Sequence, residues 1–216
     1  MAYPTHVAAA LSGASTRQLQ YWRQAHGHAP LLEPEVRSGS RIFYSFRDVI
    51  ALRTFVYLRE EISLQRIRRA VKALRELGNT DHLSEYRLCA NGNSVIWVDG
   101  NQDLVDLVKN PGQYVMKVAM RDLLDSFTNR QGDEVVPLLQ PRQRLEVNPG
   151  IRGGYPVVTG TRIPYDLIAG LVADGLPESD IAYFYPSVDA AAAADAFDFY
   201  KYVESLRDNE VSSAAQ

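Results

Sequence analysis

Polar and aromatic side chains share the outer face of a short predicted helix near the N-terminus. A capping-box pattern, Ser15 followed three residues later by Gln18, predicts that this helix begins there and runs to about Ala25. Leu19 and Trp22 lie three residues apart and are expected to face the core. The opposite face carries Arg17, Gln20, Tyr21 and Gln24. Such groups make hydrogen bonds to phosphates and base edges when a helix lies in a major groove.

A second group of cations follows in a predicted β-hairpin. Two β-prone stretches, 31–36 and 41–44, flank a turn that contains Gly39. Arg37 and Arg41 stand at the two ends of that turn. Guanidinium groups placed there can lie along the backbone or the minor groove of a duplex. The hairpin is therefore expected to act as a wing beside the first group.

Further helices are expected to hold this surface in place. Thr5 can cap an apolar run over 7–11, which predicts a first helix that ends at Gly13. Helices over 46–59 and 64–77 follow the hairpin, each preceded by a serine that can cap it. The last of these helices is basic on one side, through Arg66, Arg68, Arg69, Lys72 and Arg75. Residues 1–79 are thus predicted to form a winged helix-turn-helix.

Charge is divided unevenly along the chain. Residues 1–79 hold twelve Lys and Arg against six Asp and Glu, whereas residues 80–216 hold eleven against twenty. A basic front suits a polyanion, and the acidic back is expected to have another task. A single cysteine excludes an internal disulfide and a multi-thiolate metal site. With no long apolar run and no basic start to a leader, we expect a cytoplasmic protein without membrane contact, metal or cofactor.

The front of the chain resembles the DNA-binding domain of the MerR family. Three segments carry the resemblance in order, 13–22, 40–45 and 62–67. It implies that Arg17 and Tyr21 hold phosphates from the recognition helix and that Arg41 does so from the wing. The family usually has Arg where this chain has Gln20, so its base preference does not transfer. The expected DNA-contacting residues are Ser15, Thr16, Arg17, Gln18, Gln20, Tyr21, Arg23, Arg37, Ser40, Arg41 and Tyr44.

Residues 80–130 depart from that family. A MerR-type chain continues into a long dimerisation helix, but 78–81 breaks helicity here, and no heptad run follows. We expect a small α/β element with strands over 86–90, 95–98 and 113–118 and helices over 102–108 and 121–129. Its first hairpin could pair across a twofold axis and replace the missing coiled coil. Nothing in this region calls for catalysis, so no catalytic residue is assigned and the protein is not expected to be an enzyme.

The C-terminal part of the chain is predicted to form a second helical module. Residues 131–144 look like a linker, 145–208 form the module and 209–216 are expected to be a flexible tail. A β-ribbon should lead into a helix begun at Pro164, and three helices are predicted over 165–174, 177–185 and 189–206. The motif Gly-Gly-x-Pro-Val-Val-x-Gly-Thr-Arg-Ile-Pro, which ends at Pro164, resembles a bacterial domain of unknown function frequent in VapB-type antitoxins.

With the MerR-like front, this resemblance implies an antitoxin that binds double-stranded operator DNA as a homodimer and neutralises a PIN-like ribonuclease toxin. The acidic charge of residues 159–208 argues against a second DNA reader and favours a protein contact. Arg162 could bind a toxin carboxylate, although we favour a role in fixing the turn at Gly160. The expected partner-binding residues are Arg162, Tyr183, Tyr185, Phe199 and Tyr202. The core of the module is expected to contain Ile168, Leu171, Val172, Ile181, Phe184, Phe197 and Tyr200.

The expected fold is mainly α with small β elements. A winged helix-turn-helix comes first, then the α/β element, then a helix-turn-helix-like module of three helices preceded by the ribbon. Two other functions remain open. One is a MerR-like transcriptional regulator that responds to a small-molecule effector, and the other is a protein adaptor that never binds DNA.

Overall fold

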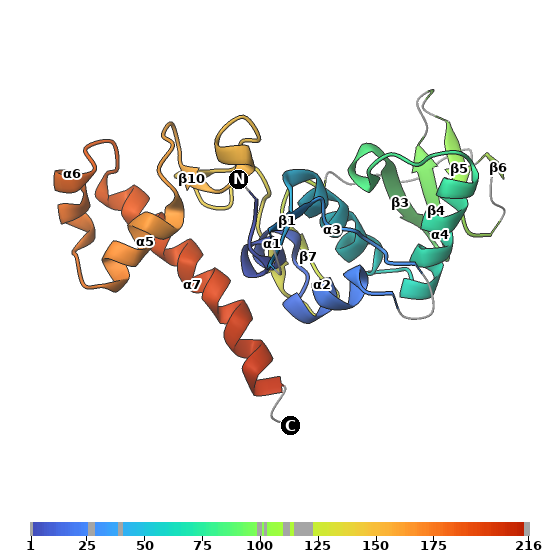
Figure 1. The fold of residues 1–216 in the computed structure, drawn as a ribbon, viewed down its shortest axis with the longest axis horizontal. Coiled ribbons are helices and arrows are strands. Elements are labelled where there is room, and N and C mark those ends of the chain that lie inside the picture. The colour runs from blue at the N-terminus through green and yellow to red at the C-terminus, as the bar shows by residue number, and fades with distance from the viewer. Residues whose placement is uncertain are drawn as a thin grey trace.

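The computed structural model describes residues 2–25, 29–38, 41–98, 101, 103–109, 113–114 and 123–213. Figure 1 shows an elongated molecule with the first three helices in the middle. A small sheet and α4 lie at one end of the long axis, and the C-terminal helices α5 and α6 lie at the other. The mainly helical fold with small antiparallel sheets is as predicted.

The N-terminal helices are α1 (Thr5–Ser12) and α2 (Thr16–Arg23). Gly13 joins them with a φ of 76°, a left-handed conformation that glycine adopts without strain. The predicted capping box of Ser15 and Gln18 is confirmed, because each side chain accepts the other residue's backbone N–H. The expected cap at Thr5 is wrong, since Thr5 is already the first helical residue and Pro4 precedes it without a side-chain cap.

A hairpin and two helices complete this part of the fold. The hairpin pairs β1 (Val36–Ser38) with β2 (Arg41–Phe43), and the helices are α3 (Phe46–Leu58) and α4 (Leu64–Glu76). The side chains of Ser45 and Ser63 cap these helices as predicted. Trp22 and Phe55 meet edge to face at 5.9 Å in the core between α2 and α3, in the position expected for Trp22.

The middle of the chain is more β-rich than expected. A single helical turn, η1 (Leu83–Glu85), leads into a sheet with the order β3-β4-β5-β6. Its strands are β3 (Arg87–Asn91), β4 (Ser94–Val98), β5 (Leu104–Asp106) and β6 (Gln113–Tyr114). The first hairpin is confirmed. The helix predicted over 102–108 is wrong, because Val105 pairs with Trp97 and buried Asp106 accepts the N–H groups of Val108 and Lys109.

A second small hairpin replaces the helix expected to end near Asn129. It pairs β7 (Phe127–Thr128) with β8 (Glu134–Val135), and Val135, Val136 and Leu138 are buried. The start of the segment predicted as a linker is therefore packed against the N-terminal helices. Residues 115–122, which include parts of the predicted third strand and second helix, lie outside the described residues.

The C-terminal module begins with a two-stranded ribbon and ends with a long helix. Its elements are β9 (Leu145–Glu146), η2 (Arg152–Gly154), β10 (Val157–Val158), α5 (Tyr165–Ala173), η3 (Glu178–Asp180), α6 (Ile181–Phe184) and α7 (Ala190–Ser213). The ribbon and the three helical segments are as expected. The last helix is longer than predicted, because α7 continues to Ser213.

Buried contacts join the module to the N-terminal helices. The Tyr3 hydroxyl donates to the Gly154 carbonyl at 2.6 Å, and the Tyr3 ring stacks on Tyr155 at 6.3 Å. On the other side, α7 packs against α1, and the Tyr202 hydroxyl donates to the Ala10 carbonyl at 3.4 Å. No helix in the described part of the chain combines the length and apolarity needed to span a bilayer.

Candidate nucleic-acid interface

The outer face of α2 carries the side chains that were predicted from the sequence to lie there. Arg17, Gln20 and Tyr21 are exposed, and the Tyr21 side chain keeps 42% of its surface accessible. Leu19 and Trp22, on the opposite face, are buried at 1% and 2%. The helix thus presents a guanidinium, an amide and a phenol together on one exposed surface.

Two of the predicted contact residues also hold the start of α2. The Ser15 hydroxyl accepts the Gln18 N–H at 3.1 Å, and the Gln18 side-chain oxygen accepts the Ser15 N–H at 2.9 Å. These hydrogen bonds fix the helix N-terminus where it leaves the turn. Of the three polar residues that could read bases, Thr16 and Gln18 are partly buried and Gln20 is exposed.

The wing is only partly described. Arg41 begins β2 and is exposed, and Arg37 pairs with Ile42 across the hairpin. The side chain of Arg37 and all of Ser40 lie outside the described residues. Arg41 is therefore accessible, and its role as a phosphate contact stays a prediction.

Tyr44 does not lie on this surface, which corrects its assignment as a DNA contact. Only 1% of Tyr44 is exposed, and its backbone bridges to Tyr3. Burial raises the pKa of the Tyr44 phenol, so the group stays protonated. Arg23 donates to the Tyr44 hydroxyl at 3.4 Å and is half-buried. This hydrogen bond links α2 to the end of the wing, and Tyr44 is not available to DNA.

The exposed face of α4 carries further cations, which were not among the predicted DNA contacts. The Arg68 guanidinium lies over the Tyr21 ring, 5.5 Å from its centre, and connects α4 to α2. Arg69, Lys72 and Arg75 are exposed along the same helix. The basic pattern of this helix was visible in the sequence. Its position beside Tyr21 was not, because that depends on how α4 packs against α2.

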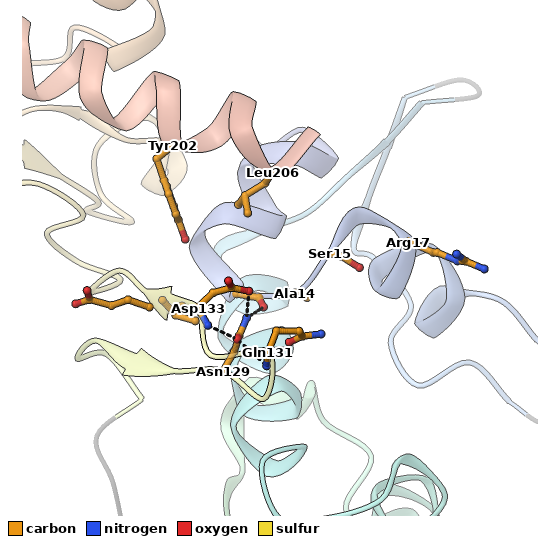
Figure 2. Close-up of a pocket in the computed structure, with 11 residues that line it drawn as sticks. Ala14, Ser15, Arg17, Asn129, Gln131, Asp133, Tyr202 and Leu206 are labelled. Carbon is orange, nitrogen blue, oxygen red and sulfur yellow. Dashed lines mark hydrogen bonds between the residues drawn. The ribbon is translucent and has the colours of Figure 1, made fainter. Parts of the chain in front are cut away.

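A cavity of about 200 Å³ lies at the turn between α1 and α2 (Figure 2). One wall is the β7–β8 hairpin, where Asn129 donates to the Gly13 carbonyl at 3.2 Å and to Asp133. Tyr202 and Leu206 of α7 reach over the turn from the other side, while Arg17 points away. Both later parts of the chain therefore contact the turn that sets the direction of α2.

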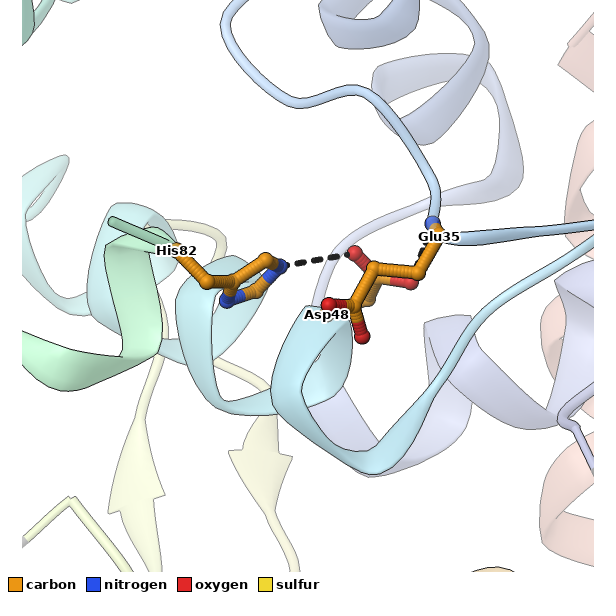
Figure 3. A group of neighbouring side chains, drawn as sticks. All are labelled: Glu35, Asp48 and His82. Carbon is orange, nitrogen blue, oxygen red and sulfur yellow. Dashed lines mark hydrogen bonds and ion pairs between the residues drawn. The ribbon is translucent and has the colours of Figure 1, made fainter. Parts of the chain in front are cut away.

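One group of metal-ligating side chains is present among the described residues. Glu35, Asp48 and His82 place their ligand atoms within 4.8 Å of one another (Figure 3). The Ser84 N–H donates to His82 Nδ1, so the ring proton sits on Nε2 and faces Asp48 Oδ1 at 3.1 Å. The other Asp48 oxygen accepts the N–H groups of Ser45 and Glu35. The Glu35 carboxylate accepts the Ser45 hydroxyl and pairs with Arg47. All three side chains therefore have protein partners, and Asp48 forms part of the N-terminal cap of α3.

The predicted partner-binding residues of the C-terminal module differ in how exposed they are. Tyr183 is 86% exposed and Arg162 is exposed, whereas Tyr185 is half-buried. Phe199 is fully buried and packs edge to face on Tyr165 at 4.8 Å, so its assignment to an interface is wrong. Tyr202 is half-buried at the cavity beside α1, and burial raises its pKa.

Phe184 was expected in the core but is 60% exposed. Its helix α6 has only four residues and is anchored by the buried side chain of Ile181, which leaves the next turn pointing outward. Phe184 and Tyr183 contact each other instead, edge to face at 5.3 Å. The two rings form an exposed aromatic pair at the end of the molecule.

Two known protein families match this chain, one at each end. Residues 3–74 match the model of the MerR HTH family regulatory proteins, and residues 145–200 match a protein family of unknown function, DUF433. The chain therefore carries an N-terminal MerR-type helix-turn-helix and a C-terminal DUF433 domain.

The chain is also similar to two curated proteins and to one solved structure. The uncharacterized HTH-type transcriptional regulators Rv1830 of Mycobacterium tuberculosis and Mb1861 of Mycobacterium bovis are 33% identical over 119 residues. The match covers 55% of this chain and 52% of each relative, so the chain spans about half the length of these relatives. The crystal structure of Rv2018 from Mycobacterium tuberculosis shares the fold, with a TM-score of 0.53 and 14% identity over 91% of this chain and 96% of that one.

Proposed function

We propose that this protein is a transcriptional regulator that binds double-stranded DNA through α2, the wing and the exposed face of α4. The observation that carries the proposal is the contact of Arg68 of α4 with the Tyr21 ring of α2, which brings the basic helix α4 beside the predicted recognition helix. Arg17 of α2 and Arg41 of the wing are exposed and add two further cations.

The contacts divide into two kinds. Guanidinium and ammonium groups neutralise phosphates and release counterions, which supplies affinity without sequence information. We assign this role to Arg17, Arg41 and the exposed cations of α4. Amide side chains read base edges in the major groove, and Gln20 is the exposed amide best placed for that role.

Footprinting on the region upstream of the protein's own gene tests this function. We expect a protected segment that is lost or weakened in Arg17→Ala, Tyr21→Ala and Arg41→Ala. Lys201→Ala removes an exposed cation of α7 and serves as the matched control. Equal protection by all four variants would contradict the assignment, and no protection by the wild type anywhere in that region would remove operator binding.

The finer proposal is an antitoxin that represses its own operon and neutralises a PIN-like ribonuclease. The motif that ends at Pro164 supports it, as does the exposed aromatic pair of α6, which offers a protein contact. The names of the relatives mention only transcriptional regulation.

Co-expression with the product of the adjacent gene tests the antitoxin proposal. Where that gene encodes a PIN-like ribonuclease, we expect co-purification and loss of ribonuclease activity. Ribonuclease activity that persists in the presence of excess protein would refute neutralisation and leave DNA binding untouched.

Binding as a homodimer is part of the same proposal. A twofold dimer matches paired half-sites one helical turn apart, and β3 is an edge strand of the described sheet that could pair with its copy. Sedimentation of the complex with a footprinted duplex is expected to give two chains per duplex. One chain per duplex would contradict the dimer.

A further inference from the structure

Two surfaces at opposite ends of the molecule have opposite charge, and each has an apolar part. The first, which we call the aromatic knob, consists of Tyr183 and Phe184 on α6. The second, the basic pocket, lies between α4 and the segment that follows α2. Figure 1 places α6 and α4 at opposite ends of the long axis, so the two surfaces of one chain cannot meet.

The knob is apolar, and acidic residues precede it in the chain. Tyr183 and Phe184 are 86% and 60% exposed. Asp174, Glu178 and Asp180 lie on the turn and the short helix η3 that lead into α6. Within the described residues these carboxylates form no ion pair with a Lys or Arg of their own chain.

The pocket has the opposite character. Pro30, Leu31 and Val71 make an apolar floor, while Arg69, Lys72 and Arg75 stand around it. Lys72 also forms an exposed ion pair with Glu76 at 3.5 Å. Its volume is about 220 Å³. Pockets for drug-sized ligands span roughly 300–1,000 Å³, so this one suits a single aromatic side chain better than a larger ligand.

We infer that the aromatic knob of one copy docks into the basic pocket of a second copy. An aromatic ring would cover the apolar floor, and the carboxylates beside α6 would face the cations around the pocket. Apolar burial supplies affinity, and complementary charge fixes the orientation and accelerates the encounter. The contact joins different surfaces of the two copies, so it is head-to-tail and can extend to further copies unless it closes into a ring.

This inference deepens the proposed function and rests on it, because the pocket cations lie on the α4 face assigned to DNA phosphates. A knob seated in the pocket covers Arg69 and Lys72, so self-association and DNA binding compete. The contact would therefore hold the protein off DNA at high protein concentration and release it when DNA is in excess.

Sedimentation velocity of the full chain without DNA tests the contact directly. We expect concentration-dependent association that weakens as salt rises, because exposed charge pairs are screened over about 8 Å at physiological ionic strength. The variant Tyr183→Ser/Phe184→Ser should raise the dissociation constant of self-association at least about tenfold, as expected for central aromatic contacts. Leu139→Ser, which also removes an exposed apolar side chain, is the matched control and should leave association unchanged.

A charge-exchange pair excludes general loss of structure as the cause. Arg69→Glu/Lys72→Glu and Glu178→Lys/Asp180→Lys should each fail to self-associate, because like charges then face each other. Mixing the two variants should restore association between their reversed surfaces. No association in the mixture, or self-association by either variant at the wild-type level, would overturn the inference.

The two proposals fail separately. Wild-type self-association that added duplex DNA does not reverse would leave the contact standing and remove its competition with DNA. Absence of any DNA complex, with self-association intact, would refute the proposed function and the competition with DNA, and would leave the contact between copies standing. A wild-type chain that binds DNA but never self-associates through the knob would refute only this inference.

Discussion

Replacing Arg53 with Met should destabilise the whole chain more than any surface substitution. Arg53 of α3 is fully buried and donates to the backbone carbonyls of Leu11, Leu123, Asp125 and Val136 at 2.5–2.9 Å. Its guanidinium also lies over the Phe127 ring at 5.0 Å. One side chain thus ties the end of α1 and the β7–β8 region to α3.

The expected loss follows from two opposing effects. Each hydrogen bond from a charged donor contributes roughly 1.5–3 kcal/mol, so four amount to about 6–12 kcal/mol. Burying the guanidinium costs several kcal/mol, which Met recovers. The four carbonyls are left without this donor, and we expect a net loss of about 3–5 kcal/mol. For a chain of 150–250 residues, about 2–4 °C per kcal/mol gives a melting temperature lower by roughly 6–20 °C.

Thermal unfolding followed by circular dichroism measures this loss. Arg47→Met is the matched control, because Arg47 lies on the same helix in exposed ion pairs with Glu35 and Glu85. Its loss should stay below about 1 kcal/mol. Equal melting temperatures for Arg53→Met and Arg47→Met would refute the reasoning, since the buried hydrogen bonds would then contribute nothing net.

Further substitutions and a pH change test the elements around the interface. Gly13→Ala places a Cβ against Val135 Cγ2 at a φ of 76°, and we expect lower stability and weaker DNA binding, both partly restored by adding Val135→Ala. A Gly13→Ala protein as stable as the wild type would show that the turn is not constrained. Ser15→Ala removes the cap of α2 and should cost about 1 kcal/mol in a urea titration; no change would mean that Gln18 alone holds the helix start. Burial raises the pKa of the Tyr3 and Tyr155 phenols above the about 10 of an exposed one. The unfolded chain releases these protons above about pH 10 while the folded chain keeps them, so the free energy of unfolding should fall there and stay unaffected below. Ionisation of all tyrosines near pH 10 without unfolding would contradict this burial.

Local signals in the sequence predicted the N-terminal part well. Each helix of the MerR-type domain after the first begins at a serine whose side chain accepts a backbone N–H, and such caps depend on neighbours only three residues away. The division of α2 into a buried and an exposed face followed from the spacing of Leu19 and Trp22. The exposure of Arg17 and Tyr21 could therefore be predicted.

The predictions failed where the structure of a segment depends on contacts with residues far away in the chain. The stretch 104–106 has a short apolar pattern that suits helix or strand, and pairing with β4 selected the strand. Phe199 and Phe184 exchanged their expected places because α7 packs on α5 through Phe199, while α6 is too short to bury Phe184. The role of Arg53 was missed for the same reason, since its carbonyl partners lie 42–83 residues away.

The salt dependence of DNA affinity tests the central claim most directly. Fluorescence anisotropy with a duplex from the protein's own upstream region should give an affinity that falls linearly with salt on logarithmic axes, with a slope of roughly 0.9 per neutralised phosphate. Arg17→Ala and Arg69→Ala, one from α2 and one from α4, should each reduce that slope by about one. A slope unchanged in both variants, or a wild-type protein that does not bind the duplex at low salt, would contradict the account.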